Sequence, residues 1–219
     1  GVFFMRQYLV DVIPDELIEA ARVDGQFNRW FLDPIFRGAY PADVVEDIRA
    51  VDADAVAAFE EAVQEGDLAV VSTSIDFLGV NYYHGEYVTG HVPANPAPKG
   101  EAPTDWPKRS PFPAMGGVHW AERGLARTTM NWGVQPEGMV ELLLHLRDTC
   151  PGLPLVITEN GSAWDDVVDD DGAVHDPERV DFLVRHLTAM ATAMERGADV
   201  RGYFAWSLLD NFEWARGYA

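Results

Sequence analysis

LVITENG, at residues 155–161, is a short run of apolar and β-branched residues that ends in a glutamate, an asparagine and a glycine. Its length and composition predict a short β-branched strand over residues 154–158 that ends at Glu159. The Asn-Gly pair that follows is typical of a turn. The segment therefore predicts a carboxylate directly at the end of a strand.

Strand and helix alternate on both sides of this segment. Helices are predicted over residues 135–149 and 176–196, because each begins with a proline followed by an acidic residue. Further strands are predicted over residues 74–83, SIDFLGVNYY, and over residues 200–207. This alternation favours an α/β fold with βα units and a parallel sheet. In such units the functional residues lie at the carboxyl ends of the strands.

The first third of the chain has a helical pattern. A helix is predicted over residues 14–23 and is expected to stop at Gly25. The aromatic segment 28–41 predicts a short helix and a turn, cut by its prolines and its glycine. Residues 42–66 are predicted to be helical with a break near residues 51–54.

The composition restricts the classes of function. The chain has 219 residues, 47% of them hydrophobic, which predicts one globular domain with a sizeable core. With 36 acidic and 16 basic side chains, its net charge of -20 excludes binding to nucleic acid or to anionic membranes. No transmembrane helix is predicted. The lone Cys150 fits a reducing cytoplasm and is interpreted as a core or loop residue rather than a nucleophile.

Two polar stretches are interpreted as loops. Residues 89–113 contain repeated prolines, which forbid regular structure over a long segment. The acidic run 165–171 suggests calcium at first sight, but the EF-hand spacing would put Val167 where the first ligand must be. A solvated loop is therefore the preferred interpretation, and neither a metal nor a cofactor is predicted.

Three long motifs occur in a recognisable order and spacing. They are DFLGVNYY at residues 76–83, LVITENG at 155–161 and WSLLDNFEWARGY at 206–218. Together they resemble the family 1 glycoside hydrolases, which are retaining β-glucosidases. Segments 28–41, 136–143 and 170–187 are also similar, so the resemblance covers residues 21–219. It implies an α/β fold in which this chain forms part of a (β/α)8 TIM barrel, about its last three βα units.

The resemblance also implies catalytic residues. Glu159 matches the family's nucleophile, the carboxylate that attacks the anomeric carbon and forms a glycosyl-enzyme intermediate. Taken alone, Glu159 could equally be an exposed acid at a strand end. Tyr83 matches the tyrosine that orients this carboxylate, and Asn81 is expected to face the same pocket. Both of these side chains could instead simply fill the interior of the barrel.

Further residues match the family's sugar-binding positions. Glu213 and Trp214 match the pair that binds the hydroxyls of the nonreducing-end sugar, and Trp206 matches the aromatic platform under the sugar ring. Trp132 is expected toward the leaving-group side, although Gly133 stands where the family usually has an acid. The implied substrate is a β-glucoside or a short β-linked oligosaccharide.

The second carboxylate of the retaining mechanism is not found in the sequence. The family's general acid/base is the glutamate of an Asn-Glu-Pro tripeptide, and no Asn-Glu pair occurs in the 219 residues. Hydrolysis of β-D-glucosides is therefore expected only where a complementary barrel fragment supplies the acid. The alternative is a noncatalytic barrel fragment that associates with itself or binds a partner protein.

The N-terminal segment has a second resemblance. Residues 1–25 resemble the cytoplasmic coupling loop of sugar-importer permeases, with its EAA at residues 19–21 and Asp-Gly at 24–25. This divides the chain into a permease-like segment, 1–25, and the C-terminal part of a glycosidase barrel, 26–219, joined as a fusion. An amphipathic helix of similar sequence is the simpler alternative. A permease-like helix could also dock on an importer ATPase.

Overall fold

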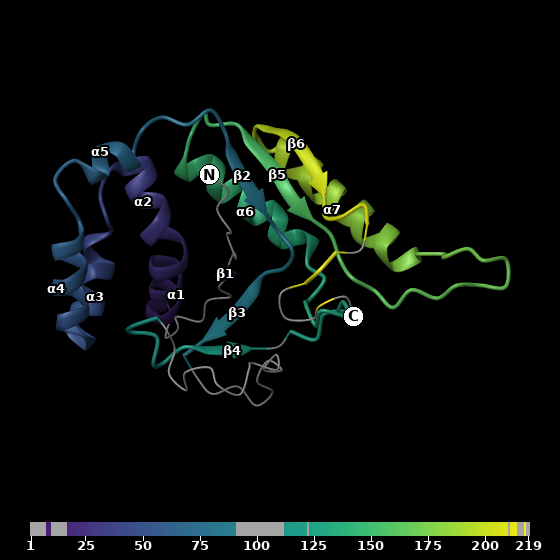
Figure 1. Ribbon diagram of the computed structural model, residues 1–219, viewed down its shortest axis with the longest axis horizontal. Coiled ribbons are helices and arrows are strands. Elements are labelled where there is room, and N and C mark those ends of the chain that lie inside the picture. Colours follow the sequence, from purple (N-terminus) through teal and green to yellow (C-terminus); the bar gives the residue numbers. More distant parts are fainter. Residues whose placement is uncertain are drawn as a thin grey trace. The chain divides into compact units, whose positions relative to one another are not determined.

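The computed structural model describes residues 8–9, 17–90, 112–121, 123–209, 211–213 and 217. The chain divides into two compact units, which are coloured by sequence in Figure 1. Within the described residues, the first unit contains Asp76–His84 and Leu125–Ala219, and the second contains Arg6–Ile75 and Gly85–Gly124.

The first unit is built on a parallel sheet of three strands in the order β2-β5-β6. The strands are β2 (Leu78–Asn81), β5 (Leu155–Asn160) and β6 (Val200–Ala205). Helix α6 (Pro136–Thr149) precedes β5, and α7 (Pro177–Glu195) connects β5 to β6. Figure 1 shows both helices on one side of this sheet. The predicted α/β fold with a parallel sheet is confirmed in this unit.

Apolar residues at helical spacing hold α6 and α7 together and against the sheet. On α6 the buried side chains are Met139, Leu142, Leu143 and Leu146, and on α7 they are Phe182, His186, Ala189 and Ala193. Burying one leucine side chain contributes about 1.5–3 kcal/mol to stability. The predicted N-cap is also present, because the Asp176 carboxylate accepts a hydrogen bond of 3.3 Å from the backbone N–H of Arg179.

The ends of the three strands differ from the prediction. Strand β2 is shorter than the predicted 74–83, and β6 ends at Ala205 rather than at residue 207. Strand β5 continues through Glu159 to Asn160, so the predicted Asn-Gly turn is wrong. The cause is a pair of contacts distant in sequence. The Asn160 amide donates to the Tyr82 carbonyl and accepts from the Tyr203 hydroxyl, each at 2.7 Å, which holds Asn160 in the strand.

The second unit combines helices with a small mixed sheet. Its helical elements are α1 (Leu17–Asp24), the π-helix η2 (Gly25–Arg29), α2 (Trp30–Arg37), α3 (Ala42–Val51), α4 (Ala53–Ala62) and α5 (Asp67–Val71). Its sheet has the order β1-β3-β4, from β1 (Tyr8–Leu9), β3 (Glu86–Thr89) and β4 (His119–Ala121). Strand β3 pairs with β1 in parallel and with β4 antiparallel.

The helical run of this unit is longer than predicted. The predicted stop at Gly25 is wrong, because the helix continues through η2 into α2, and Pro34 lies inside α2 rather than cutting it. A Cβ atom on Gly25 would lie 2.5 Å from Cγ2 of Val44, so the glycine allows α3 to pack closely here. The predicted break in residues 42–66 is confirmed at Asp52, whose carboxylate caps α4.

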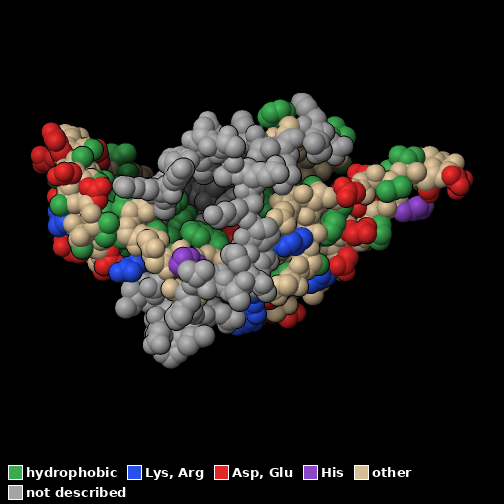
Figure 2. Space-filling model, turned by 90° about the horizontal axis from the view of Figure 1, so that it is seen from below, with side chains coloured by type: hydrophobic (Ala, Val, Ile, Leu, Met, Phe, Trp, Pro, Cys, Tyr) green, Lys and Arg blue, Asp and Glu red, His purple; other side chains and the backbone are tan. Residues whose placement is uncertain are grey.

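The two predicted loops are described to different extents. Most of the proline-rich segment 89–113 lies outside the described residues, and its first residue ends β3. Residues 161–176 form an acidic loop, and Figure 2 shows acidic side chains along its projecting tip. In this loop the Asp169 carboxylate accepts two backbone N–H groups at 2.9 Å. Among the described residues, no cluster of metal-ligating side chains occurs, and no helix is long and apolar enough to cross a membrane.

Candidate active site

The site is built where β2 and β5 end side by side. The register of this strand pair shifts between Val80 and Asn81, so that Asn81 lies opposite Glu159. Two residues later the chain carries Tyr83, whose hydroxyl donates a hydrogen bond of 2.7 Å to Oε2 of Glu159. Two side chains that are 76 positions apart in the sequence are thus brought together by the parallel sheet.

Tyr83 is held in its protonated form. Burial, the hydrogen bond to Glu159 and the negative charges of Glu159 and Glu213 all raise the pKa of the Tyr83 phenol above its ordinary value of 10.0. The hydroxyl is therefore a proton donor at every physiological pH. The contribution of Glu213 also indicates that its carboxylate lies near the phenol.

Only one oxygen of Glu159 is engaged by the described part of the chain. Oε2 accepts from Tyr83, whereas no hydrogen bond to Oε1 is recorded among these residues. No arginine or lysine of the described residues forms an ion pair with Glu159 either. The carboxylate is thus oriented through Oε2, and its second oxygen has no recorded hydrogen-bond partner in this part of the chain.

Asn81 lies beside Glu159 but is deeply buried. Its Oδ1 accepts a hydrogen bond of 2.5 Å from the Thr158 hydroxyl, and its side-chain nitrogen is buried without a partner in the described structure. An unpaired buried N–H group is costly. Asn81 thus carries an unpaired donor at the end of β2, the strand that pairs with the Glu159 strand.

Trp132 packs directly against the end of β2. Its ring lies 5.2 Å from the Tyr83 ring and is stacked on the imidazole of His84 at 5.1 Å. A tight turn presents it, since the Thr128 N–H donates to the Trp132 carbonyl at 3.0 Å and Asn131 has a positive φ of 63°. Trp132 therefore lies at the same end of the sheet as Glu159.

Trp206 follows the end of β6, next to the Glu159 strand. The backbone N–H of Trp206 donates a hydrogen bond of 3.0 Å to the Asn160 carbonyl, and the Trp206 side chain is exposed. A Cβ atom on Gly161 would lie only 1.8 Å from the Trp206 carbonyl oxygen. Glycine is therefore required after Asn160 because the Trp206 backbone occupies that space.

The segment after β6 is described in part. Glu213 and Gly217 exchange two backbone hydrogen bonds of 2.8 and 2.7 Å, and the φ of +67° at Gly217 suits a tight turn. This turn holds Glu213 in place near Tyr83. Trp214 lies outside the described residues.

Sequence reasoning did not assign three residues that shape this site. Asn160 fastens β5 to β2 and β6, Thr158 holds the Asn81 amide, and His84 supports the Trp132 ring. Asn160 and Thr158 lie within the motif at residues 155–161, and His84 directly follows the motif at residues 76–83, which was the available signal. Their roles depend on partners far away in the sequence, which a local pattern does not show.

Comparison with known proteins finds relatives that are more than twice as long as this chain. A bifunctional beta-D-glucosidase/beta-D-fucosidase of Bifidobacterium breve is 42% identical over 202 residues, covering 90% of this chain and 41% of the relative. A psychrophilic beta-glucosidase of Micrococcus antarcticus matches in structure with a TM-score of 0.84 and 45% identity, covering 100% of this chain and 45% of that chain. A beta-glucosidase of Thermotoga maritima in complex with deoxynojirimycin matches with a TM-score of 0.75 and 36% identity, covering 100% of this chain and 43% of that chain.

These structural neighbours are TIM-barrel β-glucosidases, and this chain spans less than half the length of each relative. The family model described as "Glycosyl hydrolase family 1" matches residues 5–219, almost the whole chain. The chain therefore belongs to glycosyl hydrolase family 1.

Proposed function

We propose that this chain carries the nucleophile half of a retaining β-glucosidase site, within a part of a (β/α)8 barrel. The observation that supports it most strongly is the 2.7 Å hydrogen bond between Tyr83 and Glu159 at the carboxyl ends of adjacent parallel strands. The relatives named as β-glucosidases support a β-glucoside or a short β-linked oligosaccharide as the substrate.

In the proposed reaction, an electron pair of Oε1 of Glu159 forms the bond to the anomeric carbon. The bond from that carbon to the leaving-group oxygen breaks, and a general acid gives that oxygen a proton. Water then attacks the anomeric carbon of the glycosyl ester while the deprotonated general acid takes a proton from it, which releases the sugar and restores both the Glu159 carboxylate and the acid. Throughout both steps Tyr83 donates to Oε2, which fixes the carboxylate and keeps Oε1 directed at the sugar.

The sugar is proposed to bind between the described aromatic and acidic side chains. Trp206 offers its exposed ring to the apolar face of the sugar. Glu213 accepts hydrogen bonds from sugar hydroxyls, and the indole N–H of Trp214 donates to a sugar hydroxyl. Trp132, stacked on His84, faces the leaving-group side. Asn81, whose backbone pairs with that of Glu159, offers its unpaired side-chain N–H as a hydrogen-bond donor to the sugar.

The general acid is proposed to come from a polypeptide that corresponds to the rest of the barrel. Within the described residues, β2 and β6 each have one strand partner, so two sheet edges are left to pair. Helix α7 also exposes an apolar stripe at helical spacing, formed by Val180, Val184, Leu187 and Met194. These features suit a partner that continues the sheet and covers α7.

The same exposed stripe supports the alternative, a noncatalytic fragment that associates with itself. In that case the melting temperature rises with the concentration of the chain. Leu187→Glu, which places a charge in the centre of the stripe, removes this concentration dependence. A melting temperature that is independent of concentration in the unsubstituted chain contradicts self-association.

The catalytic proposal is tested with 2,4-dinitrophenyl 2-deoxy-2-fluoro-β-D-glucoside, whose leaving group hardly needs an acid. We expect the intact mass of the purified chain to increase by one fluoroglucosyl group, and Glu159→Gln to remain unlabelled. A full-length relative, such as the enzyme of Bifidobacterium breve, serves as the positive control. An unlabelled chain beside a labelled relative would show that the pocket is not formed.

A further inference from the structure

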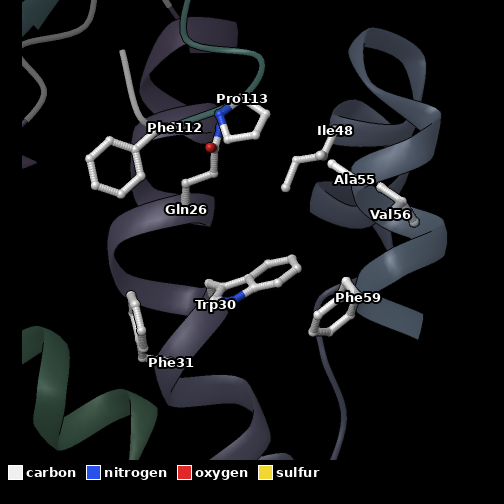
Figure 3. A pocket seen from close by; sticks show the side chains of 9 residues that line it. All are labelled: Gln26, Trp30, Phe31, Ile48, Ala55, Val56, Phe59, Phe112 and Pro113. Carbon is white, nitrogen blue, oxygen red and sulfur yellow. The ribbon is translucent and has the colours of Figure 1, made fainter. Parts of the chain in front are cut away.

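A half-open cavity of about 230 Å³ lies in the second unit, and none of its lining residues is assigned to catalysis (Figure 3). Figure 3 shows it between the helical run that carries Gln26, Trp30 and Phe31 and the helices that carry Ile48 and Phe59. The aromatic segment 28–41, for which the catalytic proposal gives no role, forms one of its walls.

Four aromatic side chains line this cavity: Trp30, Phe31, Phe59 and Phe112. Trp30 and Phe59 contact each other, with their ring centroids 4.8 Å apart. Both rings also contact Tyr40, whose ring centroid lies 5.2 Å from that of Trp30 and 4.8 Å from that of Phe59. Because these rings support one another, the cavity is formed before any ligand binds. Aromatic walls favour a ligand ring, which can stack on them or meet them edge to face.

Among the described residues that line the cavity, Gln26 carries the only side-chain amide, and Trp30 adds an indole N–H. Gln26 is only 5% exposed, and no hydrogen bond of its side chain is recorded among the described residues. Figure 3 shows the side chain extending from the helix toward the end of the cavity formed by Phe112 and Pro113. Because this amide lines the cavity and no partner is recorded for it among the described residues, a ligand that hydrogen-bonds to it gains an interaction that a purely apolar ligand lacks.

The volume and the charge of the cavity define the ligand further. An apolar cavity of about 150 Å³ is large enough to bind benzene, so about 230 Å³ accommodates one or two fused rings. No charged side chain occurs among the described residues that line the cavity, and the chain has a net charge of -20, which disfavours anions. We propose that this cavity binds a small neutral aromatic molecule with one hydroxyl group, a phenol or a naphthol, which pairs with Gln26.

The test measures binding of 2-naphthol to the full chain by isothermal titration calorimetry. Ala55 lines the cavity but is itself exposed, so Ala55→Trp fills the space without disturbing the core. We expect this substitution to raise the Kd by at least about tenfold. Ala57→Trp is the matched control, because Ala57 is an exposed residue of the same helix that does not line the cavity, and its Kd is expected to be unchanged.

A second variant tests the hydrogen bond. Gln26→Leu keeps a side chain of similar size. It is expected to raise the Kd of 2-naphthol by about tenfold and to leave the Kd of naphthalene nearly unchanged. If Ala55→Trp does not fold, as judged by circular dichroism, Ala55→Leu fills part of the cavity and gives an intermediate Kd. The proposal is overturned if 2-naphthol does not bind the unsubstituted chain, or binds Ala55→Trp and Ala57→Trp equally well. It is also overturned if Gln26→Leu raises the Kd of naphthalene as much as that of 2-naphthol.

Discussion

Tyr83→Phe removes a single oxygen atom, the one that donates to Oε2 of Glu159 at 2.7 Å. The phenylalanine ring can keep the contact with Trp132, whose ring lies 5.2 Å away, so the packing is preserved. A hydrogen bond to a charged group contributes about 1.5–3 kcal/mol. If this energy orients the attacking carboxylate, its loss slows glycosylation of Glu159 by about 10- to 150-fold.

The rate is measured as the time course of labelling by 2,4-dinitrophenyl 2-deoxy-2-fluoro-β-D-glucoside, followed by intact mass. Tyr40→Phe is the matched control, because Tyr40 belongs to the aromatic cluster of the second unit and is expected to leave the rate unchanged. Because burial and Glu159 raise the pKa of Tyr83, the rate of the unsubstituted chain should also not fall as the pH approaches about 10. Labelling of folded Tyr83→Phe at the unsubstituted rate would refute the orienting role.

Three further predictions concern the packing of the first unit. His186 is fully buried, and burial lowers its pKa to about 4. Between about pH 6.5 and pH 4 the unfolded chain therefore binds a proton that the folded chain does not, so the free energy of unfolding should fall by up to about 1.4 kcal/mol for each pH unit that the pH is lowered. Urea titrations of His186→Leu should show a flatter dependence of the free energy of unfolding on pH. Burial raises the pKa of Cys150 from 9.0 to about 11, so iodoacetamide at pH 8 should alkylate it about 100-fold more slowly than it alkylates a free thiol. Alkylation of Cys150 in the folded chain at the rate of a free thiol would disprove the burial. Gly161→Ala should lower the free energy of unfolding, measured by urea titration, by about 1–3 kcal/mol, because its Cβ would lie 1.8 Å from the Trp206 carbonyl oxygen. Gly116→Ala is the control and should have little effect, because its Cβ would meet nothing within 4 Å.

The βα units could be predicted because their signals are local. The apolar run before Glu159 and the Asp176 cap at the start of α7 each depend on neighbours within a few residues. The errors occurred where distant residues decide the outcome. Gly25 continues a helix because Val44 packs against it, and Asn160 stays in a strand because Tyr82 and Tyr203 bind its amide.

The site could be predicted in part for the same reason. Glu159 and Tyr83 belong to two motifs, and the parallel sheet brings their strand ends together as the alternation of strand and helix implies. The buried donor of Asn81 and the stacking of His84 on Trp132 could not be predicted, because both depend on the three-dimensional register of β2 with its neighbours. Roles in sugar binding for Glu213 and Trp206 stay predictions.

The central claim is that Glu159 is the nucleophile, and locating the trapped sugar tests it most directly. After labelling with the 2-fluoro glucoside, the chain is digested and the modified peptide is sequenced by tandem mass spectrometry. We predict a single fluoroglucosyl ester on Glu159, within the peptide that contains LVITENG. An ester on any other carboxylate, or a label that persists in Glu159→Gln, would contradict the account.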